Sequence, residues 1–181
     1  MYLTIKKITG IRYLYAESIQ RIKGEHARDK HYEGSFGRIY KLNPNERTTT
    51  EAENELRVCN LYESESISDK IKKKYFFELY KCGFVHVGGG ILSKSSDNIY
   101  VDLETLSVFR SQKSYPHLSR NSTKRIVLEI NEGFLCDYTL ERIIRYRHDN
   151  KKDENENRKI LLRWYIEAGL PLEDDCLKDW T

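Results

Sequence analysis

Apolar and polar residues alternate at the start of the chain in three short stretches. Residues 2–8 (YLTIKKI), 11–19 (IRYLYAESI) and 35–42 (SFGRIYKL) place β-branched or aromatic side chains two positions apart. This period is typical of strands with one buried face. Gly10 and the polar segment 23–34 separate the stretches. The pattern therefore predicts a three-stranded antiparallel sheet.

The period then changes to that of a helix. Thr48 and Glu51 have the spacing of a capping box, in which each side chain accepts a hydrogen bond from the other residue's backbone amide. A first helix is therefore predicted from Thr48. A second helix is predicted near Ser68, where apolar residues recur at intervals of four at Ile71, Tyr75 and Leu79.

Strand patterns return at 84–87, 98–103 and 124–130, and helical patterns follow at 138–148 and 156–169. This order predicts the α+β class, with small antiparallel sheets, helices and a C-terminal helical pair. The 181 residues fit a single domain, 1–181. Its predicted subregions are the sheet plus helix of residues 1–62 and the helical part of residues 134–181. The pattern leaves open whether the two sheet regions share a core.

Targeting segments and cysteine spacing indicate in which cellular compartment a protein is found. The chain has no basic-then-apolar leader and no apolar run of about 20 residues. Its four cysteines form no CxxC pair, which favours reduced thiols over disulfides or a zinc site. We therefore expect a cytoplasmic protein with no membrane association, no cofactor and no bound metal.

Charge is distributed unevenly although the formal net charge is only +3. Residues 1–49 carry ten Lys and Arg against five acidic residues, whereas residues 105–128 carry five basic residues and no acidic one. The final residues, 171–181, are acidic. A chain polarised in this way can present a basic face to a polyanion.

Residues 107–125 combine five basic residues with five serines and one threonine, and they separate two strand patterns. A loop of this length is usually functional or disordered. Lys and Arg release counterions from phosphates, and hydroxyls add hydrogen bonds. The predicted anion-binding residues here are Arg110, Lys113, Arg120, Lys124 and Arg125. The alternative is a surface loop without a partner.

Residues 8–61 join three strands rich in Arg, Lys and Tyr to the segment TTTEAENEL. This arrangement resembles the sheet-plus-helix module with which tyrosine recombinases and AP2-type proteins place a β-sheet in a DNA groove. The resemblance implies that strand side chains face nucleic acid, and those side chains would be Arg12, Tyr13, Arg38, Tyr40 and Lys41. The alternative is a sheet with one solvated face.

Acidic residues suggest an enzymatic alternative. Clustered carboxylates hold the metals of many phosphodiester-cleaving enzymes, and Asp102, Glu104 and Glu129 lie in or just after predicted strands. The segments IYVDLETL, IVLEINEGFL and YIEAGLPLEDD resemble strand motifs of EAL-type cyclic-dinucleotide phosphodiesterases, although the EAL triplet itself is absent. This alternative is a metal-dependent phosphodiesterase or nuclease that uses these three carboxylates.

Two further motifs have structural interpretations. No helix pattern follows Gly88, Gly89 and Gly90, so a hairpin or bulged strand is favoured over a phosphate-binding loop. Cys82 and His86 have the residue types of a nucleophile and its base, but a buried thiol near a structural histidine is favoured.

The preferred hypothesis is a small non-enzymatic binding or modulator protein. It would act through a basic surface on nucleic acid or on a nucleic-acid-handling protein complex, or through the acidic segment from Glu173 to Asp179 as a phosphate mimic. Because the composition is rich in Lys, Tyr, Ile and Asn, a regulator or inhibitor encoded by a phage or mobile element is the suggested origin. A protein-interaction module without nucleic acid is the second alternative.

Overall fold

The computed structural model describes residues 2–21, 28–44, 47–64, 66–111, 123–147 and 149–172. The first half of the chain contains β1 (Tyr2–Ile8), β2 (Ile11–Arg21), β3 (Arg28–Lys41), α1 (Thr49–Cys59) and α2 (Ile67–Lys81). The strands that follow are β4 (Val85–Gly88), β5 (Ile91–Lys94), β6 (Ile99–Asp102), β7 (Ser107–Ser111), β8 (Thr123–Ile130) and β9 (Gly133–Leu135), with a short 3-10 helix, η1 (Ser95–Asp97), after β5. Helices α3 (Asp137–Ile144) and α4 (Glu154–Glu167) complete the described elements.

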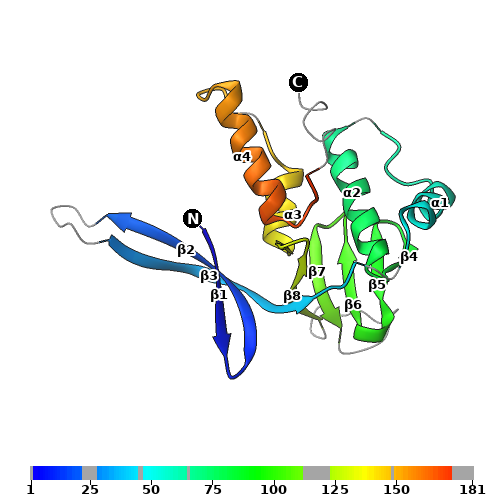
Figure 1. The fold of residues 1–181 in the computed structure, drawn as a ribbon, viewed down its shortest axis with the longest axis horizontal. Coiled ribbons are helices and arrows are strands. Elements are labelled where there is room, and N and C mark those ends of the chain that lie inside the picture. The colour runs from blue at the N-terminus through cyan, green and yellow to red at the C-terminus, as the bar shows by residue number, and fades with distance from the viewer. Residues whose placement is uncertain are drawn as a thin grey trace.

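The strands of the described ranges belong to one mixed sheet of nine, in the order β1-β2-β3-β8-β7-β6-β5-β4, with β9 paired to β8. The first three strands are antiparallel and extend to one side as an arm (Figure 1). Parallel pairing of β3 with β8, from Arg38↔Ile126 to Lys41↔Glu129, joins this arm to the body. The predicted α+β class and C-terminal helical pair are confirmed, and the two sheet regions form one sheet.

The arm is attached through one of its two faces. Leu14 of β2 and Ile39 of β3 are buried against Val127 of β8 and Cys136, in a small apolar cluster. Side chains alternate along a strand, so Tyr13 and Tyr40 lie on the opposite face. Tyr13 and Tyr40 line a pocket there, together with residues of β7 and β8.

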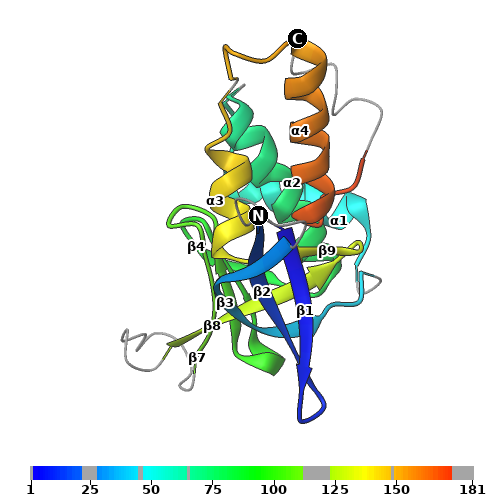
Figure 2. The same ribbon diagram turned by 90° about the vertical axis from the view of Figure 1, so that its left-hand side faces the viewer.

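The body has the larger core, which lies between the strands and helices α2, α3 and α4. These helices are grouped on the same side of the strands in Figures 1 and 2. The fully buried residues of α2 include Tyr75, Phe76 and Leu79, and Leu128 of β8 is fully buried in the same core. Burial of each such side chain contributes about 1.5–3 kcal/mol. None of the helices in the described ranges combines the length and the apolar character of a membrane span.

The predicted capping box at the start of α1 is confirmed. The Thr48 hydroxyl accepts from the Glu51 amide at 3.3 Å, and the Glu51 carboxylate accepts from the Thr48 amide at 2.7 Å. The same hydrogen bond from the Thr48 amide is the main cause that lowers the pKa of Glu51.

Replacing Thr48 by alanine is expected to lower the free energy of unfolding by about 0.5–2 kcal/mol, because the cap is lost. Urea titration followed by circular dichroism measures the change. Thr50→Ala is the matched control, since Thr50 is an exposed residue inside the helix. Equal effects of the two substitutions would contradict the role of the cap.

The structure differs from the expected pattern in two segments. Residues 107–125 are not one loop, because β7 occupies its beginning and β8 starts at Thr123. Strand β9 overlaps the start of the predicted helical subregion, residues 134–181, because Asn131 and Glu132 adopt left-handed conformations (φ 46° and 65°) and turn the chain back onto β8. The glycine triplet lies in the β4–β5 hairpin with a register shift, as the structural interpretation predicted.

Candidate functional site

A groove opens where the arm meets strands β7 and β8, with a volume of about 650 Å³. We call it the basic groove. Its lining residues are Tyr13, Gly37, Arg38, Tyr40, Asn98, Arg110, Ser111, Lys124, Arg125 and Ile126. None of the lining residues that the structure describes is acidic.

Strand register explains why residues so distant in sequence meet here. Tyr13, Arg38 and Ile126 are successive partners across β2, β3 and β8, so their side chains share a face of the sheet. Lys124 lies two residues before Ile126 on that face, and its partner across β7 is Arg110. The groove therefore draws its basic side chains from three strands.

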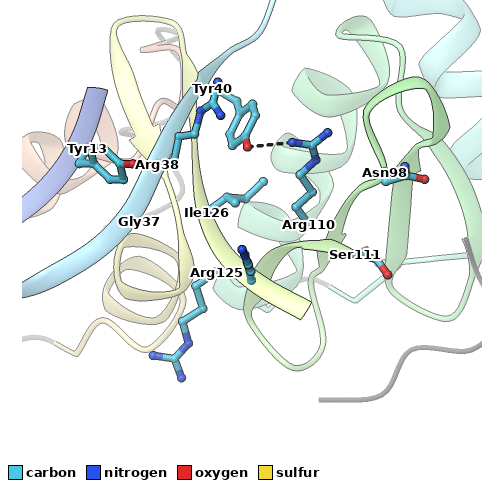
Figure 3. Close-up of a pocket in the computed structure, with 10 residues that line it drawn as sticks. Tyr13, Gly37, Arg38, Tyr40, Asn98, Arg110, Ser111, Arg125 and Ile126 are labelled. Carbon is cyan, nitrogen blue, oxygen red and sulfur yellow. Dashed lines mark hydrogen bonds between the residues drawn. The ribbon is translucent and has the colours of Figure 1, made fainter. Parts of the chain in front are cut away.

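Tyr40 lies between two guanidinium groups. The Arg110 Nη1 donates to the Tyr40 hydroxyl at 3.2 Å (Figure 3), and Arg110 Nε donates to the carbonyl of Asp97 at 3.0 Å. The guanidinium carbons of Arg38 and Arg110 lie 4.9 and 5.6 Å from the centre of the Tyr40 ring. These cation–π contacts and hydrogen bonds hold both arginines at the groove.

The positive charge of the groove is not neutralised within the described part of the chain. No salt bridge there joins a carboxylate to Arg38, Arg110 or Lys124, and all three side chains are exposed. Arginine has a planar fork of donors that suits phosphate, and lysine adds a point charge. Such a groove can bind the phosphates of a polyanion.

The side chain of Arg125 forms an ion pair with a carboxylate. Its side chain points away from the other labelled residues in Figure 3, and its Nε lies 3.2 Å from Asp137 Oδ2. Burial raises the pKa of Asp137, although hydrogen bonding by the Val108 amide and the charge of Arg125 act in the opposite direction. Arg125 therefore differs from Arg38, Arg110 and Lys124, because its charge is paired with Asp137.

Arg12 and Lys41 lie on the other face of the sheet from Arg38. Arg12 Nη1 is 2.6 Å from Glu129 Oε2, and Lys41 is the exposed strand partner of Glu129. The structure thus brings Arg38, Arg110 and Lys124 together and separates Arg12, Lys41 and the Arg125 guanidinium from them. Lys113 and Arg120 lie outside the described residues, as does the acidic segment from Glu173 to Asp179.

The three carboxylates of the enzymatic alternative have separate partners. Asp102 Oδ1 accepts from the amides of Glu104 and Thr105 at 2.9 and 3.0 Å and so stabilises a turn. Glu104 pairs with Lys72 at 2.7 Å, and Glu129 pairs with Arg12. Within the described ranges, no three His, Cys, Asp or Glu side chains gather in a way that could hold a metal.

The histidine predicted near Cys82 contacts a different cysteine. Cys59 Sγ lies 3.0 Å from His86 Nδ1, and His86 Nε2 lies 2.7 Å from the carbonyl of Gly89. A carbonyl only accepts, so His86 Nε2 donates to Gly89. Burial is the first cause that raises the pKa of the Cys59 thiol. The contact between Cys59 and His86 therefore links α1 to the β4–β5 hairpin.

Some groove residues could not be predicted from the sequence pattern. Asn98 and Ser111 line the groove only because η1 and β7 end beside it. Tyr13 and Tyr40 were indicated by the resemblance of residues 8–61 to a DNA-binding sheet-plus-helix module.

Comparison with protein-family models, with curated proteins and with solved structures finds no match to this chain. The geometry and charge of the basic groove are therefore the basis of the functional proposal.

Proposed function

We propose that this protein binds nucleic acid through the basic groove and acts as a non-enzymatic binding or modulator protein. The observation that carries the proposal is the convergence of Arg38, Arg110 and Lys124 in a groove whose described lining has no acidic residue. Phosphate contacts supply most of the sequence-independent affinity for nucleic acids.

The aromatic lining also favours nucleic acid over a simple phosphate ion. Tyr13 and Tyr40 line the groove together with the basic side chains. Aromatic rings in such positions can contact sugars and bases while the basic side chains contact phosphates. A groove of about 650 Å³ is also much larger than one phosphate requires. These features support an extended polyanion with aromatic groups as the ligand.

The first test is titration of fluorescently labelled oligonucleotides at several salt concentrations, with single-stranded and duplex probes. Arg38→Ala, Arg110→Ala and Lys124→Ala are each expected to weaken binding, the arginine substitutions by roughly tenfold because a charged hydrogen bond is lost. Each is also expected to reduce the salt slope by about 0.7–0.9, because one phosphate contact is removed.

Lys151→Ala is the matched control. It removes one positive charge at an exposed position before α4, far along the chain from the groove strands, and we expect almost no change. If all three groove variants bind with the affinity and salt slope of the unmodified protein, the basic groove is not the binding site.

A further inference from the structure

The arm carries an aromatic surface that continues from the basic groove. Tyr15 lies two residues beyond Tyr13 on β2 and therefore on the same face, about 6.8 Å further along the strand. Tyr32 of β3 and Lys6 of β1 complete the cluster. We call Lys6, Tyr13, Tyr15 and Tyr32 the tyrosine face.

The rings of the tyrosine face are held close together. The centroids of Tyr15 and Tyr32 are 5.7 Å apart with an interplanar angle of 53°. Lys6 Nζ lies 5.0 Å from the Tyr15 centroid and 5.8 Å from that of Tyr32. Contacts between the two rings and with Lys6 therefore hold the rings in place before a ligand binds. Less side-chain conformational entropy is then lost when a ligand stacks on them.

Glu17 is an acidic side chain that contacts this cluster, and it is covered. Glu17 is 6% exposed, and it accepts from Lys6 Nζ at 2.8 Å and from the hydroxyls of Tyr2 and Thr4 at 3.2 Å. The hydrogen bond from Lys6 is the main cause that lowers the pKa of Glu17, and it also raises the pKa of Lys6. The Glu17 charge is therefore paired with Lys6, and little of the Glu17 side chain is exposed on the face that carries the rings.

The tyrosine face is not the face that attaches the arm. The attachment uses Leu14 and Ile39, whose side chains point the other way. Tyr32 remains 53% exposed, so its ring surface is accessible to a ligand. Large aromatic rings at exposed strand positions next to a cationic groove are a recognised basis for stacking with nucleic-acid bases.

We propose that the basic groove and the tyrosine face together form one track for single-stranded nucleic acid. Phosphates lie against Arg38, Arg110 and Lys124, and unpaired bases stack on Tyr15 and Tyr32. A ring can stack on a base only when the face of that base is free, and in a duplex the neighbouring bases cover it. The inference rests on the proposed function and names its substrate class.

The test compares three labelled probes, each about 20 nucleotides long, which exceeds the footprint of a small single-strand-binding domain. These are oligothymidine, the duplex of oligothymidine with oligoadenosine, and an abasic strand of equal length and charge. We expect the oligothymidine strand to bind most tightly, and the abasic strand at least about fivefold more weakly because base stacking is lost.

Variants separate stacking from charge. Tyr15→Leu and Tyr32→Leu are each expected to weaken oligothymidine binding by about fivefold or more, with little effect on the abasic strand. Tyr15→Phe and Tyr32→Phe keep the rings and are expected to restore binding to nearly the unmodified level. Thermal unfolding of each variant shows whether the fold is retained.

The outcomes distinguish the two proposals. If none of the probes binds, the proposed function itself fails. If the duplex or the abasic strand binds as tightly as oligothymidine, or if the leucine variants of folded protein bind like the unmodified protein, the single-strand track is refuted while nucleic-acid binding by the groove stands.

Discussion

Replacing Gly37 by alanine is expected to lower the free energy of unfolding by at least about 2 kcal/mol. Gly37 has φ +121°, a region that residues with a side chain rarely adopt. An added Cβ would also lie 2.6 Å from the Arg125 carbonyl oxygen and 3.3 Å from Ile126 Cα. Both contacts are with backbone, so a side-chain rotation cannot relieve them.

The strain falls at the junction of arm and body, because Gly37 precedes the β3 residues that pair with β8. Urea unfolding followed by circular dichroism measures the loss of stability. Gly34→Ala is the matched control on the same strand, since nothing lies within 4 Å of its added Cβ and its backbone is not left-handed. Similar stability of the two variants would show that β3 does not approach β8 as closely as described.

Reversing two charges in the basic groove is expected to abolish nucleic-acid binding. In the double variant Arg38→Glu with Arg110→Glu, each substitution changes the formal charge by two, so the formal charge of the groove falls by four units. Like charges then face the phosphates directly, and this repulsion adds to the loss of two contacts. Both side chains are exposed, so we expect the variant to fold.

A charge-matched control separates local from general electrostatics. Lys151→Glu with Lys159→Glu makes the same change in formal charge at exposed positions on the C-terminal helical part. We expect this control to lose only the weaker, long-range attraction that salt screens. Binding that falls equally in both double variants would assign the affinity to net charge and not to the groove.

Local patterns predicted most elements because they depend on neighbours in sequence. The alternation at 2–8 and 11–19 corresponds to β1 and β2, and the capping box at Thr48 marks the start of α1. Strand β7 was not predicted within residues 107–125. Its one fully buried apolar residue, Val108, lies among serines and basic residues, so no apolar periodicity is visible there. Strand β9 is only three residues long, which is too short for a periodic signal.

Part of the candidate site was predictable for the same reason. Arg110 and Lys124 were selected because basic residues are concentrated in residues 107–125, and Arg38 because residues 8–61 resemble a DNA-binding sheet-plus-helix module. These two segments do meet in the basic groove. Arg12 was selected equally but pairs with Glu129 on the opposite face. Composition identifies basic segments. The face of the sheet on which each side chain lies depends on strand register and on the bulges in the β2–β3 pairing.

The amino-acid sequence by itself determined the α+β class, the arm strands, the first helix start and the uneven charge, since each follows from the spacing of residues along the chain. Only the tertiary structure decided that β3 pairs in parallel with β8, some 88 positions later (Arg38↔Ile126). That pairing depends on burial of Ile39 against Val127 and on the space left by Gly37. No local pattern encodes a contact of this range, and the basic groove exists because of it.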